Sequence, residues 1–206
     1  MYNYSRYVLK SEKMTKHKFE TIEIKNFKAR YLEDLIPFFK KKYNTENIHS
    51  IPKLVKVVLN VRVGQAVIVG GSTTEKQKKP LDKLSENFGL IAGQKPITCL
   101  AKQSVSNFKL RAGDVNGLKV TLRGDVMFYF LEKLVYVALP RTRNFRGFSE
   151  KNIDKSNNFS ITVKSSEVFP EGDIGTRFPI GVTMVFQNSK TKEQTVDLLR
   201  GFYIPI

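Results

Sequence analysis

The chain has 206 residues, 41% of them hydrophobic, which is enough to bury one substantial core. Its 35 Lys and Arg outnumber 19 Asp and Glu, so the formal net charge is +16 and the sequence pI is about 9.9. A protein this basic attracts polyanions, either nucleic acid or an anionic membrane. The basic residues extend from Arg6 to Arg200 rather than gathering on one amphipathic helix, so we expect nucleic acid and no membrane partner.

Several classes of site lack their characteristic residues. The single cysteine, Cys99, excludes an internal disulfide and a multi-cysteine metal site, and it indicates a reducing compartment. The two histidines, His17 and His49, are interpreted as surface or packing residues. No Gly-rich stretch has the spacing of a phosphate-binding loop, and no Ser, His and carboxylate set can be assembled. The sequence therefore predicts no enzyme, no metal site and no cofactor.

The first 50 residues differ from the rest, so we expect an N-terminal extension and helix at 1–50, ahead of one domain at 51–206. Residues 1–23 show no sustained periodicity. Asn26 is placed to cap a helix, and Pro37 would kink or divide it. The apolar residues of this helix, at helical spacing, are Phe27, Tyr31, Leu35 and Phe38.

A strand is predicted next, because apolar residues alternate with polar ones. The apolar positions are Val55, Val57, Leu59, Val61 and Val63. After a loop at 64–74, a helix is expected, with Gly93 at its end. Its apolar residues are Leu81, Leu84, Phe88 and Ile91. Next comes a short strand at 97–101. It is followed by a polar and basic segment at 102–117, with its turn at 113–117, and by a strand at 118–122.

The last part of the chain continues the mixture of helices and strands. Asp125 is expected to cap a helix that ends at Pro140. The apolar face of this helix is Phe128, Leu131, Val135 and Leu139. Strands at 159–163 and 180–186 and a helix at 191–199, stopped by Gly201, complete the pattern. It predicts an α+β fold, with helices packed on one face of an antiparallel sheet, long basic loops and an N-terminal extension.

Three basic regions are candidate RNA contacts. The segment at 102–113 interleaves cations, hydroxyls and amides, which suits phosphate and sugar contacts, although a flexible solvated loop is an equal alternative. Residues 141–148 combine arginines with two phenylalanines, for which the alternative is cations that complement a helix C-terminus. The polar faces of the predicted strands are the third region, with a plain solvent-facing sheet as the rival. The residues are, in turn, Lys102, Ser104, Asn107, Lys109 and Arg111; Arg141, Arg143 and Arg146 with Phe145 and Phe148; and Asn60, Arg62, Lys119, Thr121 and Arg123.

Several short motifs occur in a fixed order along residues 51–206. They are Leu-Asn-Val-Arg-Val-Gly at 59–64, Gly-Gln-Lys-Pro at 93–96, Val-Thr-Leu-Arg-Gly at 120–124, Leu-Pro-Arg at 139–141, Phe-Arg-Gly-Phe-Ser at 145–149 and Phe-Pro-Glu at 169–171. In this order they resemble the bacterial-type family of large-subunit ribosomal protein five.

The resemblance implies a structural constituent of the large ribosomal subunit, in its central protuberance. There it would bind 5S rRNA or an equivalent RNA, touch the large-subunit rRNA and pack beside other large-subunit proteins. The polar determinants of the 5S contact would be Asn60, Gln94, Thr121 and Arg123, with Lys95 beside them. The loop at 102–117 would approach the peptidyl-site tRNA, and the loop at 152–159 would face the small-subunit head and its protein thirteen.

The chain departs from the family pattern at a few positions. Arg62 adds positive charge at the presumed RNA face, where Gln65 also replaces a usual Glu and so removes a negative charge. Asp114 adds negative charge at the loop tip, and Asn144 replaces a common Asp. The richness in Lys, Asn, Tyr and Phe indicates an AT-rich genome, which favours a mitochondrial ribosome over a plastid or bacterial one. The alternative function is a ribosome-free RNA chaperone or regulator that uses the same basic surface.

Overall fold

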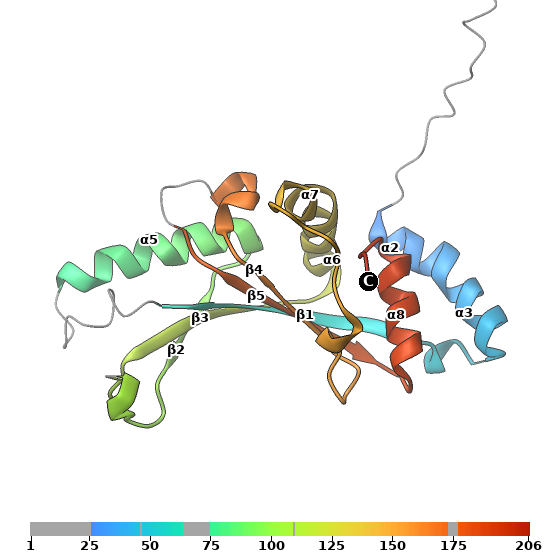
Figure 1. Cartoon of the computed structure of the whole chain (residues 1–206), viewed down its shortest axis with the longest axis horizontal. Helices are drawn as coiled ribbons and strands as arrows, with labels where there is room; N and C mark the ends of the chain where they lie inside the picture. The colour runs from blue at the N-terminus through green and yellow to red at the C-terminus, as the bar shows by residue number, and fades with distance from the viewer. Residues whose placement is uncertain (1–25, 46, 64–74, 109, 173–176) are drawn as a thin grey trace, which may run out of the picture.

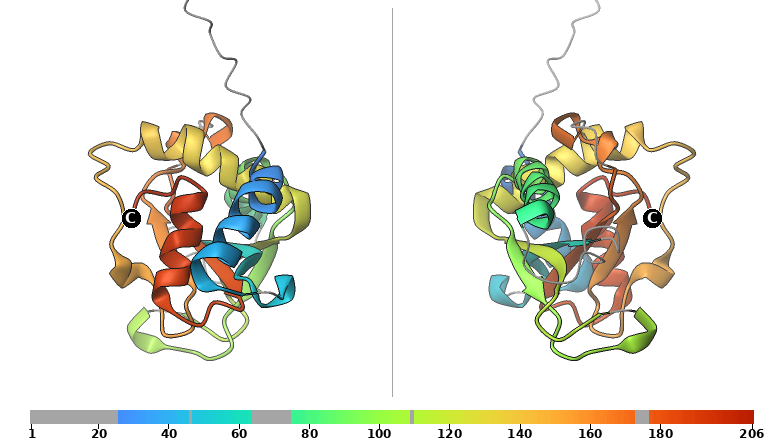
Figure 2. Two further views of the ribbon diagram at one scale, coloured as in Figure 1. Left: turned by 90° about the vertical axis from the view of Figure 1, so that its right-hand side faces the viewer. Right: turned by 90° about the vertical axis from the view of Figure 1, so that its left-hand side faces the viewer.

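The structure is a computed structural model, and it describes residues 26–45, 47–63, 75–108, 110–172 and 177–206 (Figure 1). Its five strands form one sheet in the order β2-β3-β1-β5-β4, and each neighbouring pair is antiparallel. The strands are β1 (Lys53–Arg62), β2 (Ile97–Leu100), β3 (Val115–Leu122), β4 (Phe159–Val163) and β5 (Ile180–Gln187). The end-on views in Figure 2 place the helices on one side of this sheet. The predicted α+β class is confirmed.

The helices form a layer over one face of the sheet. They are α2 (Phe27–Arg30), a π-helical segment (Tyr31–Leu35), α3 (Ile36–Tyr43), α5 (Glu75–Ala92), α6 (Gly124–Lys133), a second π-helical segment (Leu134–Ala138), α7 (Leu139–Arg141) and α8 (Lys192–Gly201). Short 3-10 helices lie at Ile48–Ser50, Ser106–Phe108, Glu150–Asn152, Ser166–Val168 and Pro170–Gly172. In the part of the chain that the structure describes, no helix has the length and apolar character needed to cross a membrane.

Each of the two π-helical segments is followed within two residues by a proline. The backbone stays in the α region from each π-helical segment into the helix that follows, so Pro37 and Pro140 lie inside continuous helices, and the wider π turn before each proline accommodates its missing N–H. The helix is therefore not divided at Pro37 but carries a wider turn before it, and the helix expected to end at Pro140 continues one residue further, to Arg141. The wider first π turn also shifts the apolar face by one residue, so Phe39 is buried and the predicted Phe38 is 45% exposed.

Three further predictions about single positions differ from the structure. Asp125 lies inside the first turn of α6, because the extended Arg123 occupies the cap position. Residues 115–117 belong to β3 rather than to the turn, and Gly117 is required there, because a Cβ would lie 2.7 Å from the Val61 carbonyl oxygen. Gly201 is the last residue of α8 rather than a residue beyond a helix that ends at 199; a Cβ at this position would lie 2.3 Å from the Leu35 side chain, so the glycine also permits close packing.

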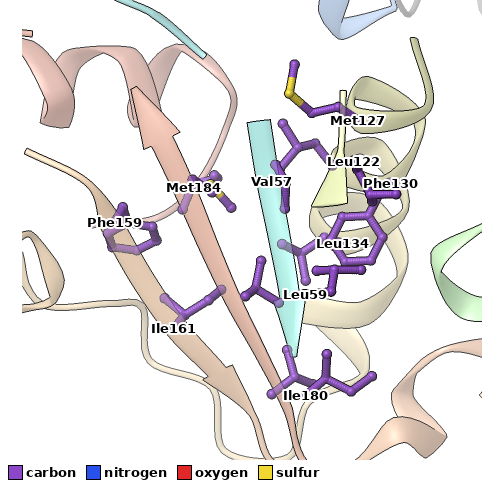
Figure 3. Close-up of a cluster of buried hydrophobic side chains, with 14 of the residues drawn as sticks. Val57, Leu59, Leu122, Met127, Phe130, Leu134, Phe159, Ile161, Ile180 and Met184 are labelled. Atoms are coloured by element: carbon purple, nitrogen blue, oxygen red, sulfur yellow. The ribbon is translucent and has the colours of Figure 1, made fainter. Parts of the chain in front are cut away.

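The core lies between the covered face of the sheet and the helices, as Figure 3 shows for its central part. Val57 and Leu59 of β1 and Met184 of β5 face side chains from α6 and the second π-helical segment, such as Phe130 and Leu134. All five side chains are at most 2% exposed. Burial of this apolar surface is the main force that holds the helical layer on the sheet.

The helix that precedes the sheet belongs to the same core. The Phe27 ring is fully buried, 5.5 Å from the Phe202 ring and 5.4 Å from the Tyr136 ring, centroid to centroid. Its backbone N–H donates to the Glu132 carboxylate at 2.7 Å. The Arg30 guanidinium lies over the Tyr203 ring at 3.7 Å. These contacts join α2 to α6 and to the C-terminal residues, while the predicted boundary at residue 50 stays a prediction.

Candidate nucleic-acid interface

The face of the sheet opposite the helices, which we call the open face, collects the predicted strand residues. Asn60 pairs with Lys119, and Arg62 pairs with Gly117. Directly paired residues of antiparallel strands point to the same side, so Asn60, Arg62, Lys119 and Thr121 share one face. Their alternate neighbours are buried on the other face. The structure thus brings these four residues together.

The sheet carries no negative charge. Not one residue in the five strands is Asp or Glu, although the chain has 19 of them. The open face carries cations on β1 and β3 instead, among them Lys53, Arg62 and Lys119, all of which are exposed. A surface with several cations and no carboxylate has a positive potential, which attracts a phosphate backbone and fits a polyanionic partner better than a plain solvent-facing sheet.

Asn60 lies at the centre of the open face, where the neighbouring strand leaves room for its side chain. It is exposed, and its neighbour on β5 is Gly181. A Cβ at residue 181 would lie 2.1 Å from the Asn60 Oδ1 atom, so the amide lies against the bare backbone of β5. An amide held flat in this way keeps both donor and acceptor available to a partner above the sheet.

Gln94, Lys95 and Arg123 lie beside this group rather than within a strand. Gln94 and Lys95 form the exposed turn between α5 and β2, after Gly93, whose φ of +69° ends the helix as predicted. Since β2 runs antiparallel to β3, the residues that precede it lie toward the end of β3 where Thr121 and Arg123 are found. These positions can therefore extend the open face at one edge of the sheet.

The basic segment between β2 and β3 is a hydrogen-bonded hairpin end. The Ala101 N–H donates to the Asp114 carbonyl at 2.8 Å, and the Asp114 carboxylate accepts from the Arg111 N–H at 2.8 Å. The Ser104 hydroxyl oxygen accepts from the Ala112 N–H at 2.9 Å. Asp114 therefore shapes the turn, and Ser104 is partly engaged within the loop. Lys102, Asn107 and Arg111 are exposed, so their side chains are available to a partner.

Three predicted arginines lie outside the strands of the sheet, Arg141 at the end of α7 and Arg143 and Arg146 in the segment that follows it. Figure 1 shows α7, which ends at Arg141, in the helical layer, and the chain after it running down to the level of the sheet. Arg141, Arg143 and Arg146 are exposed, and Arg141 donates to the Val168 carbonyl at 3.3 Å. The aromatic side chains of this segment, Phe145 and Phe148, pack against the core, and the Phe148 ring lies edge to face with the Phe159 ring at 5.6 Å, centroid to centroid. Seven of the ten predicted rRNA contacts therefore lie on or beside the open face, and the other three lie outside the strands, in a segment that offers cations rather than free aromatic rings.

Some of the predicted positions and segments lie outside the described residues. They are Lys109, Gln65, the loop at 64–74 and residues 1–25, which include most of the predicted extension. Within the described residues, no group of three or more His, Cys, Asp or Glu side chains is arranged to hold a metal ion.

Comparisons with known protein families identify the chain. The profile of ribosomal protein L5 matches residues 47–111, and the profile of the C-terminus of the same ribosomal family matches residues 115–206. The chain belongs to the ribosomal protein L5 family. This confirms the resemblance drawn from the short motifs, and with it a structural, non-enzymatic ribosomal role.

Similar relatives of this L5-family chain are bacterial proteins named large ribosomal subunit protein uL5. The one from Symbiobacterium thermophilum is 41% identical over 182 residues, covering 87% of this chain and 97% of the relative. The Acholeplasma laidlawii protein is 46% identical over 148 residues, covering 72% and 78%. The Mycoplasma pneumoniae protein is 40% identical over 184 residues, covering 88% and 97%. The similarity thus extends over nearly the whole length of two of these relatives.

Sequence reasoning missed part of the open face of this L5-family chain. Strands β4 and β5 present Ser160, Thr162 and Thr183 on that face, beside the buried alternate residues. The signal was present in the sequence, because Ser and Thr alternate with Phe, Ile, Val and Met in both strands. Neither strand contains Lys or Arg, so the cations that mark β1 and β3 as candidate RNA contacts are absent from β4 and β5.

Proposed function

We propose that this chain binds 5S rRNA, or the RNA that takes its place, through the open face of its sheet, as a structural constituent of the central protuberance of the large subunit. The observation that carries the proposal is the convergence of Asn60, Lys119, Thr121 and Arg62 on one acid-free face. RNA held by phosphate and sugar contacts needs cations, amides and hydroxyls in this arrangement rather than a catalytic centre.

The test compares two triple variants of the same residue types. Asn60→Ala, Thr121→Ala and Arg123→Ala remove groups from the open face and its edge. The control removes an exposed Asn, Thr and Arg elsewhere, namely Asn116, Thr98 and Arg200. In binding titrations with a bacterial 5S rRNA transcript, the first variant should lose at least about a hundredfold in affinity and the control less than about threefold. Equal affinities of the two variants would contradict the proposal.

The hairpin end between β2 and β3 is proposed to approach the peptidyl-site tRNA. Its exposed Lys102, Asn107 and Arg111 support this, since cations and amides suit an RNA backbone. The loop around residues 152–159 is proposed to face protein thirteen of the small-subunit head. Charge reversal of Lys102 and Arg111 should weaken peptidyl-site tRNA retention on reconstituted ribosomes, and unchanged retention would exclude the tRNA contact.

The second RNA surface is proposed to involve Arg141, Arg143 and Arg146, in contact with large-subunit rRNA. The position of these arginines outside the strands that form the open face supports a second RNA segment. Replacing the three arginines with Gln should leave 5S rRNA binding within about threefold of the wild type but lower the yield of assembled large subunits. A large loss of 5S rRNA binding would place the arginines at the first surface instead.

For the compartment, we propose a mitochondrial ribosome, supported by a composition rich in Lys, Asn, Tyr and Phe. Fractionation of the source cells would place the protein in mitochondria if this is right, and a signal confined to plastids or bacterial cytoplasm would refute it. The same lysates test the ribosome-free alternative. Migration with large subunits on a sucrose gradient is expected, and a mainly free pool would favour a chaperone or regulator.

A further inference from the structure

The open face is chemically divided across its width. Strands β1 and β3 carry its cations, Lys53, Lys56, Arg62 and Lys119. Strands β4 and β5 carry only small or uncharged groups at their outward positions, which are Ser160, Thr162, Gly181, Thr183, Val185 and Gln187. One half of the face can thus neutralise phosphate, and the other half cannot.

The strand register arranges these residues in rows that cross four strands. One row runs Lys119, Asn60, Gly181, Thr162, and the next runs Thr121, Val58, Thr183, Ser160. With strands about 4.8 Å apart, each row spans roughly 14 Å. Each row passes through β3 and β1, in the cationic half, and ends on a hydroxyl of β4; beyond Lys119 the first row continues to Ile97 of β2, which is 72% exposed.

The hydroxyls at the ends of the rows are accessible and already oriented. Ser160 and Thr162 are exposed, and the Ser160 Oγ atom lies 3.2 Å from the Thr183 Oγ1 atom, within hydrogen-bond distance. A hydroxyl both donates and accepts, so a pair of this kind can satisfy a partner that does the same. Gly181 has no side chain, so nothing projects from the sheet at this position beside Asn60.

We propose that the β4–β5 half of the open face contacts ribose 2′-hydroxyls along the minor groove of an RNA helix, while the β1–β3 half holds the adjoining phosphates. This inference rests on the proposed function and assigns a chemical specificity to the same surface. The A-form minor groove is wide and shallow and displays 2′-hydroxyls, so a flat hydroxyl-bearing surface beside cations fits it. The absence of any large apolar or aromatic side chain from the outward positions of β4 and β5 argues against a protein partner there.

The experiment uses two forms of one RNA and needs no variant for its first result. A bacterial 5S rRNA transcript is compared with the same transcript made with 2′-fluoro pyrimidines, which removes hydroxyls and keeps the A-form helix. The wild-type chain should bind the unmodified RNA about tenfold more tightly, as expected for the loss of one or two hydrogen bonds. Equal affinity for the two RNAs would overturn the inference.

A variant then locates the effect on the protein. Ser160→Ala, Thr162→Val and Thr183→Val together should bind both RNAs alike, at the wild-type affinity for the modified RNA, with an unchanged salt dependence. Thr98→Val is the matched control, because Thr98 is exposed but pairs with Leu118 on the covered side. It should keep the wild-type preference, and loss of the preference in this control alone would refute the assignment to β4 and β5.

The outcomes separate this inference from the proposed function. If the wild-type chain does not bind the unmodified transcript, both the proposed function and this inference are refuted. If it binds, and Arg62→Gln with Lys119→Gln weakens binding while the hydroxyl variant retains the wild-type preference, only the hydroxyl contact is excluded. Thr162→Val alone should already lower the preference measurably, and it tests the same point if the triple variant proves unstable.

Discussion

Replacing Phe27 with Ala tests whether the helix at residues 27–43 is part of one cooperative unit with the sheet. Phe27 is fully buried and contacts the rings of Phe202 and Tyr136. Truncating a buried Phe to Ala removes its apolar transfer free energy and leaves a cavity, at a typical cost of about 3–5 kcal/mol. For a chain of this size, that loss lowers the melting temperature by about 6–20 °C.

The assay is urea unfolding followed by far-ultraviolet circular dichroism, with the whole chain. The free energy of unfolding should fall by about 3 kcal/mol or more, with one transition and an unchanged slope against urea concentration. Phe38→Ala is the matched control; this ring is 45% exposed, so its loss should cost less than about 1 kcal/mol. A cost below about 1 kcal/mol for Phe27→Ala, or two separate transitions, would refute the single core.

Three further predictions concern charge and close packing. Lys119→Gln should reduce the slope of log K against log salt for 5S rRNA binding by about 1, since one fewer phosphate is neutralised. Gly181→Ala should displace the Asn60 amide and lower the affinity for RNA. In a double-mutant cycle, adding Gly181→Ala to Asn60→Ala should lower the affinity little further, because the displaced amide is already absent. Burial is the largest single influence on Glu171 and favours its protonated form, but the hydrogen bond from Lys133, a backbone hydrogen bond and the charge of Lys133 together outweigh it and hold the pKa of Glu171 below its ordinary value of 4.5. The carboxylate thus adds stability above about pH 4.5 that is lost as the pH falls through the lowered pKa, and Glu171→Gln should abolish that part of the acid dependence of urea unfolding.

Each of these has a control elsewhere in the chain. Lys41→Gln on α3 should leave the salt slope closer to the wild type than Lys119→Gln does. Gly89→Ala in α5 meets only ordinary contacts, so it should not affect RNA binding. Glu193→Gln, at an exposed position, should retain the wild-type acid dependence. A control that behaves like its test variant would contradict the corresponding prediction.

The strands were predictable because their side chains alternate, and the alternation alone places Asn60, Lys119 and Thr121 on polar faces. That these polar faces coincide depends on register, which the sequence of one strand does not contain. The two π-helical segments could not be predicted from the 3.6-residue period, and the one before Pro37 moved burial from Phe38 to Phe39.

Close contacts between residues of different helices and strands also could not be predicted from the sequence pattern. Gly201 looks like a helix stop, but in the structure it also admits the Leu35 side chain, and Gly181 has no signal apart from its partner Asn60 on another strand. The position of Arg141, at the end of α7 and away from the strands, is of the same kind. It depends on where α7 lies relative to the sheet, which is a property of the tertiary packing.

The most direct test of the central claim is an electron cryo-microscopy structure of the large subunit that contains this chain. RNA is expected within hydrogen-bond distance of Asn60, Thr121 and Arg123, along the open face of the sheet. An open face that contacts solvent or protein, with 5S rRNA bound only through the helical layer, would contradict the claim.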